Sequence, residues 1–219
     1  MTSHKQSGMK KIVIIGGIVI ALLLIGYFWG FYTPKRYNGI DVSHHNMVDW
    51  TEIDRNSDLE FCYVKATEGK SFKDKKCVEH SINAKKIGLN VGLYHYFRTD
   101  VPAKSQFDNF KSVYREAYSN MIPAIDVEEQ GNDFTDALAI PRLIELIGLF
   151  EKEFGCKPII YVGSLSCVKF IPEFWDCPLW LRAVKSTNII PNTAIKQAAI
   201  INNIDMNYSP NVRKLMLDK

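Results

Sequence analysis

The chain has 219 residues, of which 47% are hydrophobic and 12% aromatic, and its formal net charge is +3. This mild charge and the lack of long Lys/Arg runs argue against a nucleic-acid-binding protein, and the sequence contains no glycine-rich phosphate loop. Beyond a hydrophobic N-terminal segment, the composition suits one globular domain with a sizeable core.

That N-terminal segment, residues 12–32 (IVIIGGIVIALLLIGYFWGFY), carries no charge and is long enough to cross a bilayer as a helix. It ends in bulky aromatic residues, which favours an uncleaved anchor over a signal peptide, although cleavage stays an alternative. Lysines in residues 1–11 place this tail in the cytoplasm. We therefore expect a single-pass membrane protein. Its linker, residues 33–36, and its domain, residues 37–219, would face the periplasm or the cell wall.

The domain alternates predicted strands and helices. Strands are expected at residues 37–44, 60–67, 90–97, 122–125, 157–163, 178–184, 194–201 and 204–206, and helices at 74–87, 102–118 and 135–154. Gly88 and Gly155 suit the ends of two of these helices. Strands separated by helices predict a parallel sheet. The expected α/β fold is an irregular TIM-like (β/α) barrel, with reduced helices in its C-terminal part.

An acidic pair follows the short apolar strand at residues 122–125. Because strand side chains alternate between faces, Asp126 and Glu128 point the same way, and Val127 and Glu129 point the other way. Two carboxylates on one face repel each other when both are ionised, so one is expected to keep its proton to a higher pH. This arrangement is typical of glycosidases, in which one acid protonates the leaving oxygen and the other acts as an anion.

Other acids and aromatic residues come at the ends of further predicted strands, namely Asp41, Glu68, Tyr94, Tyr96, Tyr161 and Trp180. In βα barrels the C-terminal ends of the strands meet at one mouth, where the active site lies. Aromatic faces pack against sugars, and carboxylates bind hydroxyl groups, so this mouth suits a carbohydrate. Trp180 is equally consistent with a core position, and Asp41 with a loop cap.

The histidines and cysteines do not form a recognisable metal motif. His44 and His45 are adjacent, and adjacent strand residues point to opposite faces, which argues against a shared metal. His95 is expected to be a hydrogen-bonded core residue. The five cysteines include no C-x-x-C pair, but Cys167 and Cys177 are close enough in sequence to form a disulfide in an oxidising compartment. We expect no metal and no cofactor.

Six stretches of the chain, taken in order and with their spacing, resemble glycoside hydrolase family 25, the muramidases also called Chalaropsis-type lysozymes. They are GIDVSH from Gly39, FCYVKATEG from Phe61, GLYHYFR from Gly92, PAIDVE from Pro123, IYVG from Ile160 and PLW from Pro178. The resemblance covers residues 37–207. It implies an irregular βα barrel that hydrolyses the β-1,4 bond between N-acetylmuramic acid and N-acetylglucosamine in peptidoglycan.

The resemblance also implies residue roles. Glu128 matches the general acid, and Asp126 matches its partner, which stabilises positive charge at the sugar or orients the substrate's own N-acetyl group. The expected substrate-binding residues are Asp41, Tyr94, Tyr96, Tyr161, Trp180 and Asp205, of which Tyr96 and Trp180 rest on their strand positions. Near the C-terminus the chain departs from the family: residues 195–198 lack its tryptophan, and the final aromatic is displaced by one.

Two hypotheses from other classes stay open. One is a catalytically weak module that binds peptidoglycan and tethers the membrane to the wall. The other is a metal-dependent phosphodiesterase that uses His44 or His45. On the favoured hypothesis the protein is a monomer, its partners are peptidoglycan glycan strands and, through the N-terminal helix, the membrane, and it binds no nucleic acid.

Overall fold

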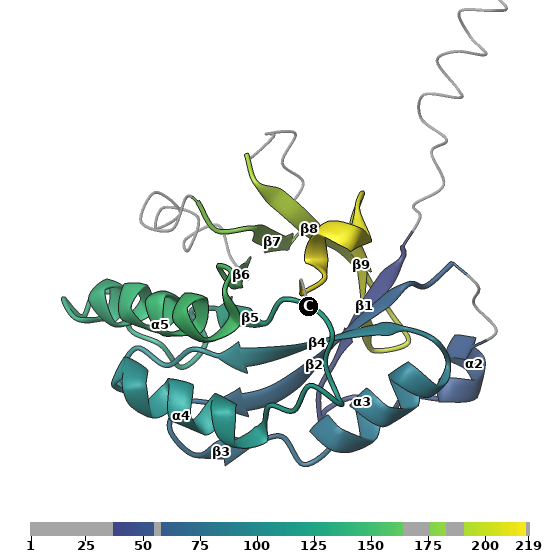
Figure 1. Ribbon diagram of the computed structural model, residues 1–219, viewed down its shortest axis with the longest axis horizontal. Helices are drawn as coiled ribbons and strands as arrows, with labels where there is room; N and C mark the ends of the chain where they lie inside the picture. The colour runs from purple at the N-terminus through teal and green to yellow at the C-terminus, as the bar shows by residue number, and fades with distance from the viewer. Residues whose placement is uncertain (1–36, 55–57, 164–175, 183–190, 218–219) are drawn as a thin grey trace, which may run out of the picture. The chain divides into compact units, whose positions relative to one another are not determined.

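Eight strands close into a barrel in the computed structural model, which describes residues 37–54, 58–163, 176–182 and 191–217 (Figure 1). β1 closes the ring because it pairs in parallel with β2 and antiparallel with β9. A short strand, β3 (Phe72–Lys73), pairs back onto β2 and stays outside the ring. In order around the barrel, the strands are β1 (Gly39–Val42), β2 (Phe61–Glu68), β4 (Asn90–Tyr96), β5 (Ala124–Val127), β6 (Ile159–Val162), β7 (Leu179–Arg182), β8 (Thr193–Ile201) and β9 (Ile204–Tyr208).

The strands run parallel from β1 through β2 and β4 to β8, and β9 alone is antiparallel to its neighbours. β9 reverses because it follows β8 through a tight turn at Asn202 and Asn203. These two residues have φ angles of 50° and 62°, in the left-handed region that asparagine tolerates well. This arrangement confirms the predicted irregular barrel and adds the direction of its last strand.

Helices cover the outside of the barrel beside its first strands: α2 (Trp50–Asp54), α3 (Cys77–Lys86), α4 (Ala103–Val113) and α5 (Ala139–Phe154). Figure 1 shows α3 and α4 beneath β2 and β4, with α5 beside β5. Between sheet and helices lies an apolar core. Phe110 stacks on Phe150 at 4.8 Å between ring centroids, and Tyr114 packs on Phe154 at 4.8 Å. In the described part of the chain no α-helix follows α5.

The helix boundaries correct three expectations. The helix predicted from residue 135 begins at Ala139, because Asp133 and Asp136 accept hydrogen bonds from the backbone N–H groups of residues 135 and 138 and hold a turn there. Leu138, which the predicted helix would have included, lies just before the observed helix and is 53% exposed. The helix predicted at residues 102–118 ends at Val113, because Tyr114 adopts extended backbone and packs its ring into the core. The helix predicted at residues 74–87 begins only at Cys77. The side chain of Asp74 lies before it and accepts hydrogen bonds from the backbone N–H groups of His44 and Lys76.

A second core fills the inside of the barrel. Phe61 and Tyr63 of β2 point inward, together with Trp180, and the 3-10 helix η2 (Val212–Leu215) closes the end of the barrel where the strands begin. The backbone N–H of Ile122 donates to the carbonyl of Leu215 at 2.8 Å, which ties this plug to the entrance of β5. The opposite end, where the parallel strands finish, is where the acids and aromatic residues of the predicted site lie.

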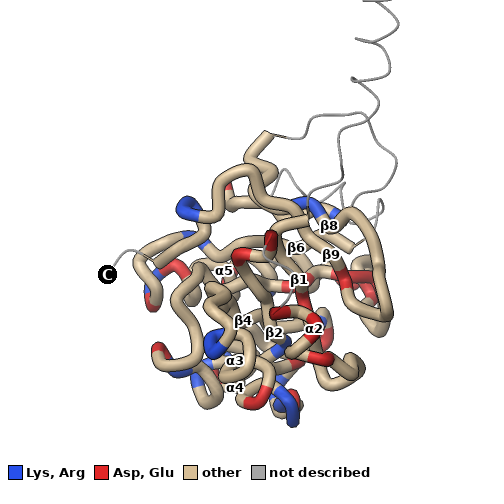
Figure 2. The backbone as a smooth tube through the Cα atoms, turned by 90° about the vertical axis from the view of Figure 1, so that its right-hand side faces the viewer, with Lys and Arg blue, Asp and Glu red and all other residues tan. Residues whose placement is uncertain are grey.

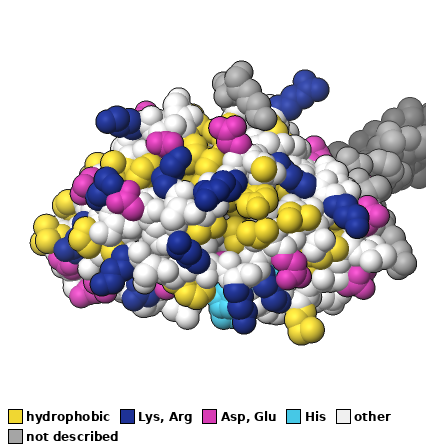
Figure 3. Space-filling model, turned by 60° about the horizontal axis from the view of Figure 1, so that its bottom comes forward, with side chains coloured by type: hydrophobic (Ala, Val, Ile, Leu, Met, Phe, Trp, Pro, Cys, Tyr) yellow, Lys and Arg dark blue, Asp and Glu magenta, His cyan; other side chains and the backbone are white. Residues whose placement is uncertain are grey.

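The outer surface is of mixed charge. On the face that is lowest in Figure 1, lysine and arginine side chains lie singly among apolar, polar and acidic ones (Figure 3). Such a mixture is typical of an ordinary solvated surface. Among the described helices none is long and apolar enough to cross a bilayer, and the anchor predicted at residues 12–32 lies outside the described ranges. Cys177 is buried, and Cys167, its predicted partner, also lies outside them.

Candidate functional site

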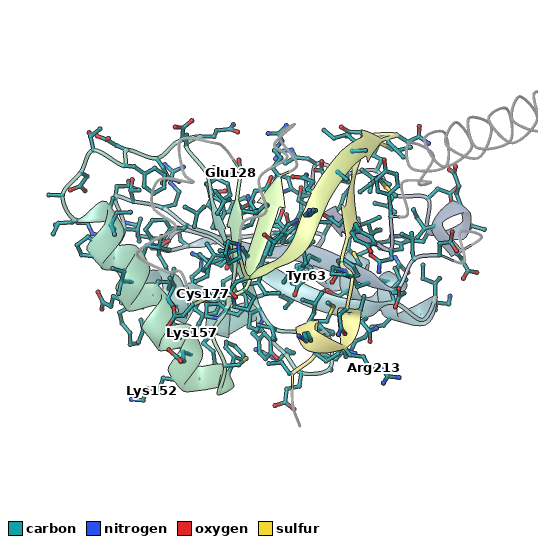
Figure 4. The ribbon with its side chains drawn as sticks, turned by 90° about the horizontal axis from the view of Figure 1, so that it is seen from above. Tyr63, Glu128, Lys152, Lys157, Cys177 and Arg213 are labelled. Carbon is teal, nitrogen blue, oxygen red and sulfur yellow. The ribbon has the colours of Figure 1, made fainter. Side chains whose placement is uncertain are left out.

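A cleft of ≈ 570 Å³ opens at the end of the barrel where the parallel strands finish. Figure 4 shows Glu128 at this end of the strands, with Cys177 at the other. All eight residues that the sequence analysis placed in a site line this cleft: Asp41, Tyr94, Tyr96, Asp126, Glu128, Tyr161, Trp180 and Asp205. Seven strands separate the first of them from the last in the chain, and closure of the ring brings them together.

Asp126 lies on β5 and Glu128 directly follows the strand, with the facing that the alternation predicts. Asp126 and Glu128 face the cleft, and Val127 between them points into the core under the helices. Burial raises the pKa of Asp126 well above the usual value, and repulsion by Glu128 adds to this. Burial also raises the pKa of Glu128. The sequence analysis attributed the expected shift to repulsion alone, and the structure identifies loss of water as the larger cause.

Glu128 is seated against Gly163, the residue that follows β6. A Cβ atom at position 163 would lie 2.5 Å from Oε1 of Glu128 and 2.7 Å from its Cγ, closer than non-bonded atoms approach. Only glycine leaves room for the carboxyl group here. Hydrogen bonding by the Tyr161 side chain and the positive charge of Arg182 both lower the pKa of Glu128 and so oppose the effect of burial.

A second acidic pair joins the two strands that close the ring. Asp41 of β1 and Asp205 of β9 are register partners, and Figure 2 shows acidic positions close together around these strands. Burial raises the pKa of Asp41 well above its usual value, with repulsion by Asp205 as the next cause. Burial likewise raises the pKa of Asp205. Besides Glu68, the cleft therefore gathers four carboxyl groups whose pKa values are all raised by burial.

Two buried amide side chains hold this second pair. Trp180 donates its indole N–H to Oδ1 of Asn207 at 2.9 Å, and Nδ2 of Asn207 donates to Oδ2 of Asp41 at 2.7 Å. Tyr161 donates its hydroxyl proton to Oε1 of Gln197 at 2.6 Å, and hydrogen bonding by the Gln197 side chain lowers the pKa of Asp205. Trp180 is 3% exposed and also lines the cleft. The core position and the cleft position that the sequence allowed are therefore compatible.

Asn207 and Gln197 were not predicted from the sequence. A signal for Asn207 was present, because it lies two residues after Asp205 on the same strand and therefore shares its face. Gln197 belongs to β8, where it pairs with Arg182 on one side and Asn207 on the other. Only the register of the closed barrel brings Gln197 next to the acids, and the sequence does not contain that register.

Positive charge faces the acids from two sides. On β2, Lys65 is nearly buried. Its Nζ atom lies 2.8 Å from Oε2 of Glu68 and 4.8 Å from the centre of the Tyr96 ring. On β7, Arg182 acts electrostatically on Glu128 and Asp205. Neither cation was identified from the sequence. Each lies two strands away from β5, so that the acidic pair is flanked by cations.

The histidines have structural partners. His44 places Nδ1 2.7 Å from Oδ2 of the buried Asp74. His95 is fully buried, within 2.7 Å of the Thr67 hydroxyl and 3.1 Å of Oε1 of Gln106, and burial lowers its pKa to about 4, as expected for a core residue. His45 lines the cleft. Within the described ranges no group of three or more His, Cys, Asp or Glu side chains is placed to hold a metal ion.

Comparison with known proteins gives one consistent family. The sequence model described as glycosyl hydrolases family 25 matches residues 40–201. The uncharacterised protein YegX of Escherichia coli K12 is 32% identical over 171 residues, which are 71% of this chain and 62% of that relative. The autolytic lysozyme of Clostridium acetobutylicum is 35% identical over 153 residues, 65% of this chain and 44% of the relative. This chain therefore spans less than two thirds of the length of both relatives.

Solved structures agree with the family. A family 25 glycosyl hydrolase from Bacillus anthracis superimposes with a TM-score of 0.68 at 26% identity, covering 84% of this chain and 94% of that one. A muramidase from Acremonium alcalophilum also gives a TM-score of 0.68, covering 80% of this chain and 94% of the other. At 20% identity the second likeness shows the fold alone.

Proposed function

Because the chain belongs to glycosyl hydrolase family 25, we propose that it hydrolyses the β-1,4 bond between N-acetylmuramic acid and N-acetylglucosamine in peptidoglycan. The observation that carries this proposal is the seat of Glu128: a partly buried carboxyl group with a raised pKa, at the wall of a cleft, two residues from a second buried acid. A carboxylic acid that keeps its proton near neutral pH is what protonation of a glycosidic oxygen needs.

In the proposed reaction Glu128 donates its proton to the glycosidic oxygen as the bond from that oxygen to the anomeric carbon breaks. The electrons of this bond go to the leaving sugar. Positive charge then develops at the anomeric carbon, where the Asp126 carboxylate stabilises it or orients the N-acetyl group that attacks it. Water completes the hydrolysis, and the Glu128 carboxylate takes up the proton that the water loses.

The remaining cleft residues suit binding of a sugar chain. Tyr94, Tyr96 and Tyr161 offer aromatic rings and hydroxyl groups, and Asp41 and Asp205 offer hydrogen-bond acceptors on the opposite wall. Oδ1 of Asp126 and Oδ1 of Asp205 are buried and have no hydrogen-bond partner among the residues that the structure describes, so each suits a sugar hydroxyl or amide as donor. A ligand that donates to these atoms relieves the cost of burying them.

We also propose that residues 12–32 anchor the protein in the membrane, with residues 1–11 in the cytoplasm and the cleft outside. The support is the uncharged stretch and its flanking lysines. Protease added to intact spheroplasts tests this orientation. Digestion of the domain in intact spheroplasts supports it, and protection of the domain until lysis contradicts it.

The experiment that tests the activity is incubation of the full chain, solubilised in detergent, with purified peptidoglycan, followed by mass spectrometry of the soluble fragments. Fragments that end in reducing N-acetylmuramic acid, and that are lost in Glu128→Gln, establish the muramidase. Fragments that end in reducing N-acetylglucosamine contradict the proposed bond. Binding without fragments identifies the tethering module instead, and activity lost on chelation identifies a metal-dependent hydrolase.

A further inference from the structure

One wall of the cleft carries a charged cluster that the proposed reaction does not use. Lys65 of β2 and Arg98, two residues after β4, both contact the carboxylate of Glu68 at the end of β2. Nζ of Lys65 lies 2.8 Å from Oε2 of Glu68, and Nη1 of Arg98 lies 3.5 Å from Oε1. All three side chains line the cleft. Two cations therefore share one carboxylate, and the cluster carries a net positive charge.

The Arg98 side chain is held in place by two glycines. Gly69, after β2, and Gly131, after β5, have φ angles of 51° and 70°, in the left-handed region that suits glycine. A Cβ at Gly131 would lie 2.4 Å from Nη1 of Arg98, and one at Gly69 would lie 3.0 Å from its Cγ. The fully buried Gln106 also bonds both the backbone N–H and the carbonyl of Arg98 at 2.9 Å. The guanidinium is therefore preorganised at the wall of the cleft.

Most donors of this guanidinium have no partner in the described part of the chain. A guanidinium carries five N–H donors. Those of Arg98 make one hydrogen bond there, from Nη1 to Glu68, and its length of 3.5 Å is long for such a bond. Asp100 lies 3.7 Å from Nε and is 74% exposed, so water and salt screen its charge. A planar group with unused donors suits a carboxylate, which it binds through two parallel hydrogen bonds.

Lys65 adds a second cation from a fixed position. Its side chain is 10% exposed, and Nζ lies 4.8 Å from the centre of the Tyr96 ring and 5.5 Å from that of Phe72. Tyr96 is anchored in turn, because its hydroxyl donates to the carbonyl of Gln130 at 2.7 Å. The positive charge is thus partly buried, where salt screens its attraction for a ligand anion less than at an open surface.

A carboxylate is also what distinguishes the two sugars of the proposed substrate. N-acetylmuramic acid is N-acetylglucosamine with an added lactyl ether, which ends in a carboxylate or continues into a peptide that carries one. An enzyme that cleaves one of two alternating β-1,4 bonds must bind a group that only one of the sugars has. Gly131, which packs on Arg98, comes three residues after Glu128, so the cation cluster and the proposed acid share one wall of the cleft.

We propose that Arg98, together with Lys65, binds the carboxylate carried by the muramic acid residue and so determines which β-1,4 bond meets Glu128. This inference rests on the proposed function and names the residues that give it its specificity. Glu68 holds the two cations apart from the catalytic acids and competes with the ligand for them. The strength of the subsite is therefore expected to depend on the balance between Arg98 and Glu68.

The test compares three tetrasaccharides of alternating N-acetylglucosamine and N-acetylmuramic acid. The lactyl carboxyl groups are free in the first, converted to the neutral methylamide in the second, and joined to L-alanyl-D-glutamate in the third. Calorimetry measures their Kd with the full chain in detergent, carrying Glu128→Gln so that none is cleaved. We expect each charged ligand to bind about tenfold more tightly than the neutral one at low salt, and the preference to shrink as salt is added. Preference for the first alone assigns the lactyl carboxylate, and preference for the third alone assigns the peptide carboxylate.

Two further substitutions in the same protein move this preference in opposite directions. Arg98→Gln leaves Lys65 and Glu68 to neutralise each other, so charged and neutral ligands bind within a factor of about two. Glu68→Gln keeps the side-chain shape and removes the competing anion, so the preference rises a further threefold or about that. Lys157→Gln is the matched control. It removes one charge of similar exposure, 30% against 29% for Arg98, at the other end of the barrel, and leaves the preference unchanged (Figure 4).

Equal affinity for charged and neutral tetrasaccharides overturns the proposal, and this result does not depend on any Arg98 variant being folded. Failure to bind all three ligands rejects the subsite as well. If Arg98→Gln weakens the three ligands by the same factor, the role of Arg98 is structural. The proposed function is judged separately. Cleavage of peptidoglycan by the native protein without a charge preference keeps the muramidase and removes the subsite, whereas a charge preference without cleavage keeps the subsite and removes the muramidase.

Discussion

The strands from β2 to β6 and the strands from β7 to β9, together with β1, present acids to the same cleft by different means. In the first group Asp126 and Glu128 extend from β5, whose outer face packs under helices, and Glu128 rests on the backbone at Gly163. In the second group, in which the described residues place no α-helix between β7 and β9, buried amides hold the acids. Asn207 binds Asp41 across the β1–β9 seam, and hydrogen bonding by the Gln197 side chain lowers the pKa of Asp205.

This difference separates two ways to position a catalytic group. Backbone alternation and tight packing determine where a carboxyl group lies, but leave its proton to burial and nearby charge. A buried amide also determines which partner carries the proton, because its oxygen only accepts and its nitrogen only donates. We therefore expect the first strand group to be most sensitive to substitutions that change side-chain shape. The second group is expected to be most sensitive to substitutions that remove hydrogen bonds.

The largest expected effect compares one acid from each group. Glu128→Gln removes the transferable proton and lowers kcat by about 10³-fold. Asp205→Asn keeps the shape of the side chain and removes only a charge and an acceptor, so its kcat falls about tenfold. Release of reducing sugar from peptidoglycan measures both. Equal losses in the two variants break the proposed division of roles.

Shape is tested at Gly163. Gly163→Ala places a methyl group 2.5 Å from Oε1 of Glu128, so the carboxyl group must move, and kcat falls by about 10-fold to 100-fold in a folded protein. Gly148→Ala is the matched control. No atom would lie within 4 Å of its new Cβ, and alanine is the better helix former inside α5. The control keeps full activity and gains about 0.5–1 kcal/mol in free energy of unfolding. An active Gly163→Ala enzyme would show that Glu128 tolerates displacement.

Hydrogen bonding is tested at Asn207, which is fully buried. Asn207→Leu leaves the Trp180 N–H without an acceptor and removes the donor to Asp41, so the free energy of unfolding falls by about 1–3 kcal/mol. Adding Trp180→Phe removes the unpaired N–H and recovers part of this loss. Urea denaturation of the native protein, Asn207→Leu and the double variant measures the free energy of unfolding. A double variant less stable than Asn207→Leu contradicts the hydrogen-bond account and indicates that the indole ring matters for its packing alone.

The smallest effect is a gain in stability. Asp126 has a raised pKa in the folded protein, so its stabilising contribution is present below its unfolded pKa and is lost as pH rises through the folded value. Asp126→Asn therefore increases the free energy of unfolding of residues 37–219 at pH 8, by about 1 kcal/mol, and the gain shrinks toward pH 4. The exposed Asp108, changed to Asn, is the control and shifts stability by less than about 0.5 kcal/mol. A gain that grows on acidification reverses the assigned sign.

Much of the first strand group was predictable, because its features are local. Alternation on one short strand placed Asp126 and Glu128, and strand ends placed Tyr94 and Tyr161. The start of α5 was wrong by four residues, because Asp133 and Asp136 form side-chain-stabilised turns that compete with the helix. Periodicity does not reveal that competition.

The second group was less predictable, because its features depend on closure. The antiparallel direction of β9 and the facing of Asp41 with Asp205 follow from how the ring shuts. Gln197 reaches Asp205 only in that register. The cause of the raised pKa of Asp126 was also misjudged: burial exceeds repulsion, and burial depends on the other seven strands.

Two aromatic side chains of β2 affect the direction from which a ligand can reach the site. A Cβ at Gly39 would lie 2.1 Å from the Phe61 ring, and one at Gly92 would lie 2.1 Å from the Tyr63 ring, so these rings lean across the backbone of both neighbouring strands. With η2 behind them, they make a solid floor. Among the described residues, the cleft opens at the other end, where the parallel strands finish. On the proposed function, a glycan strand would therefore be bound across the open end of the barrel and not threaded through it.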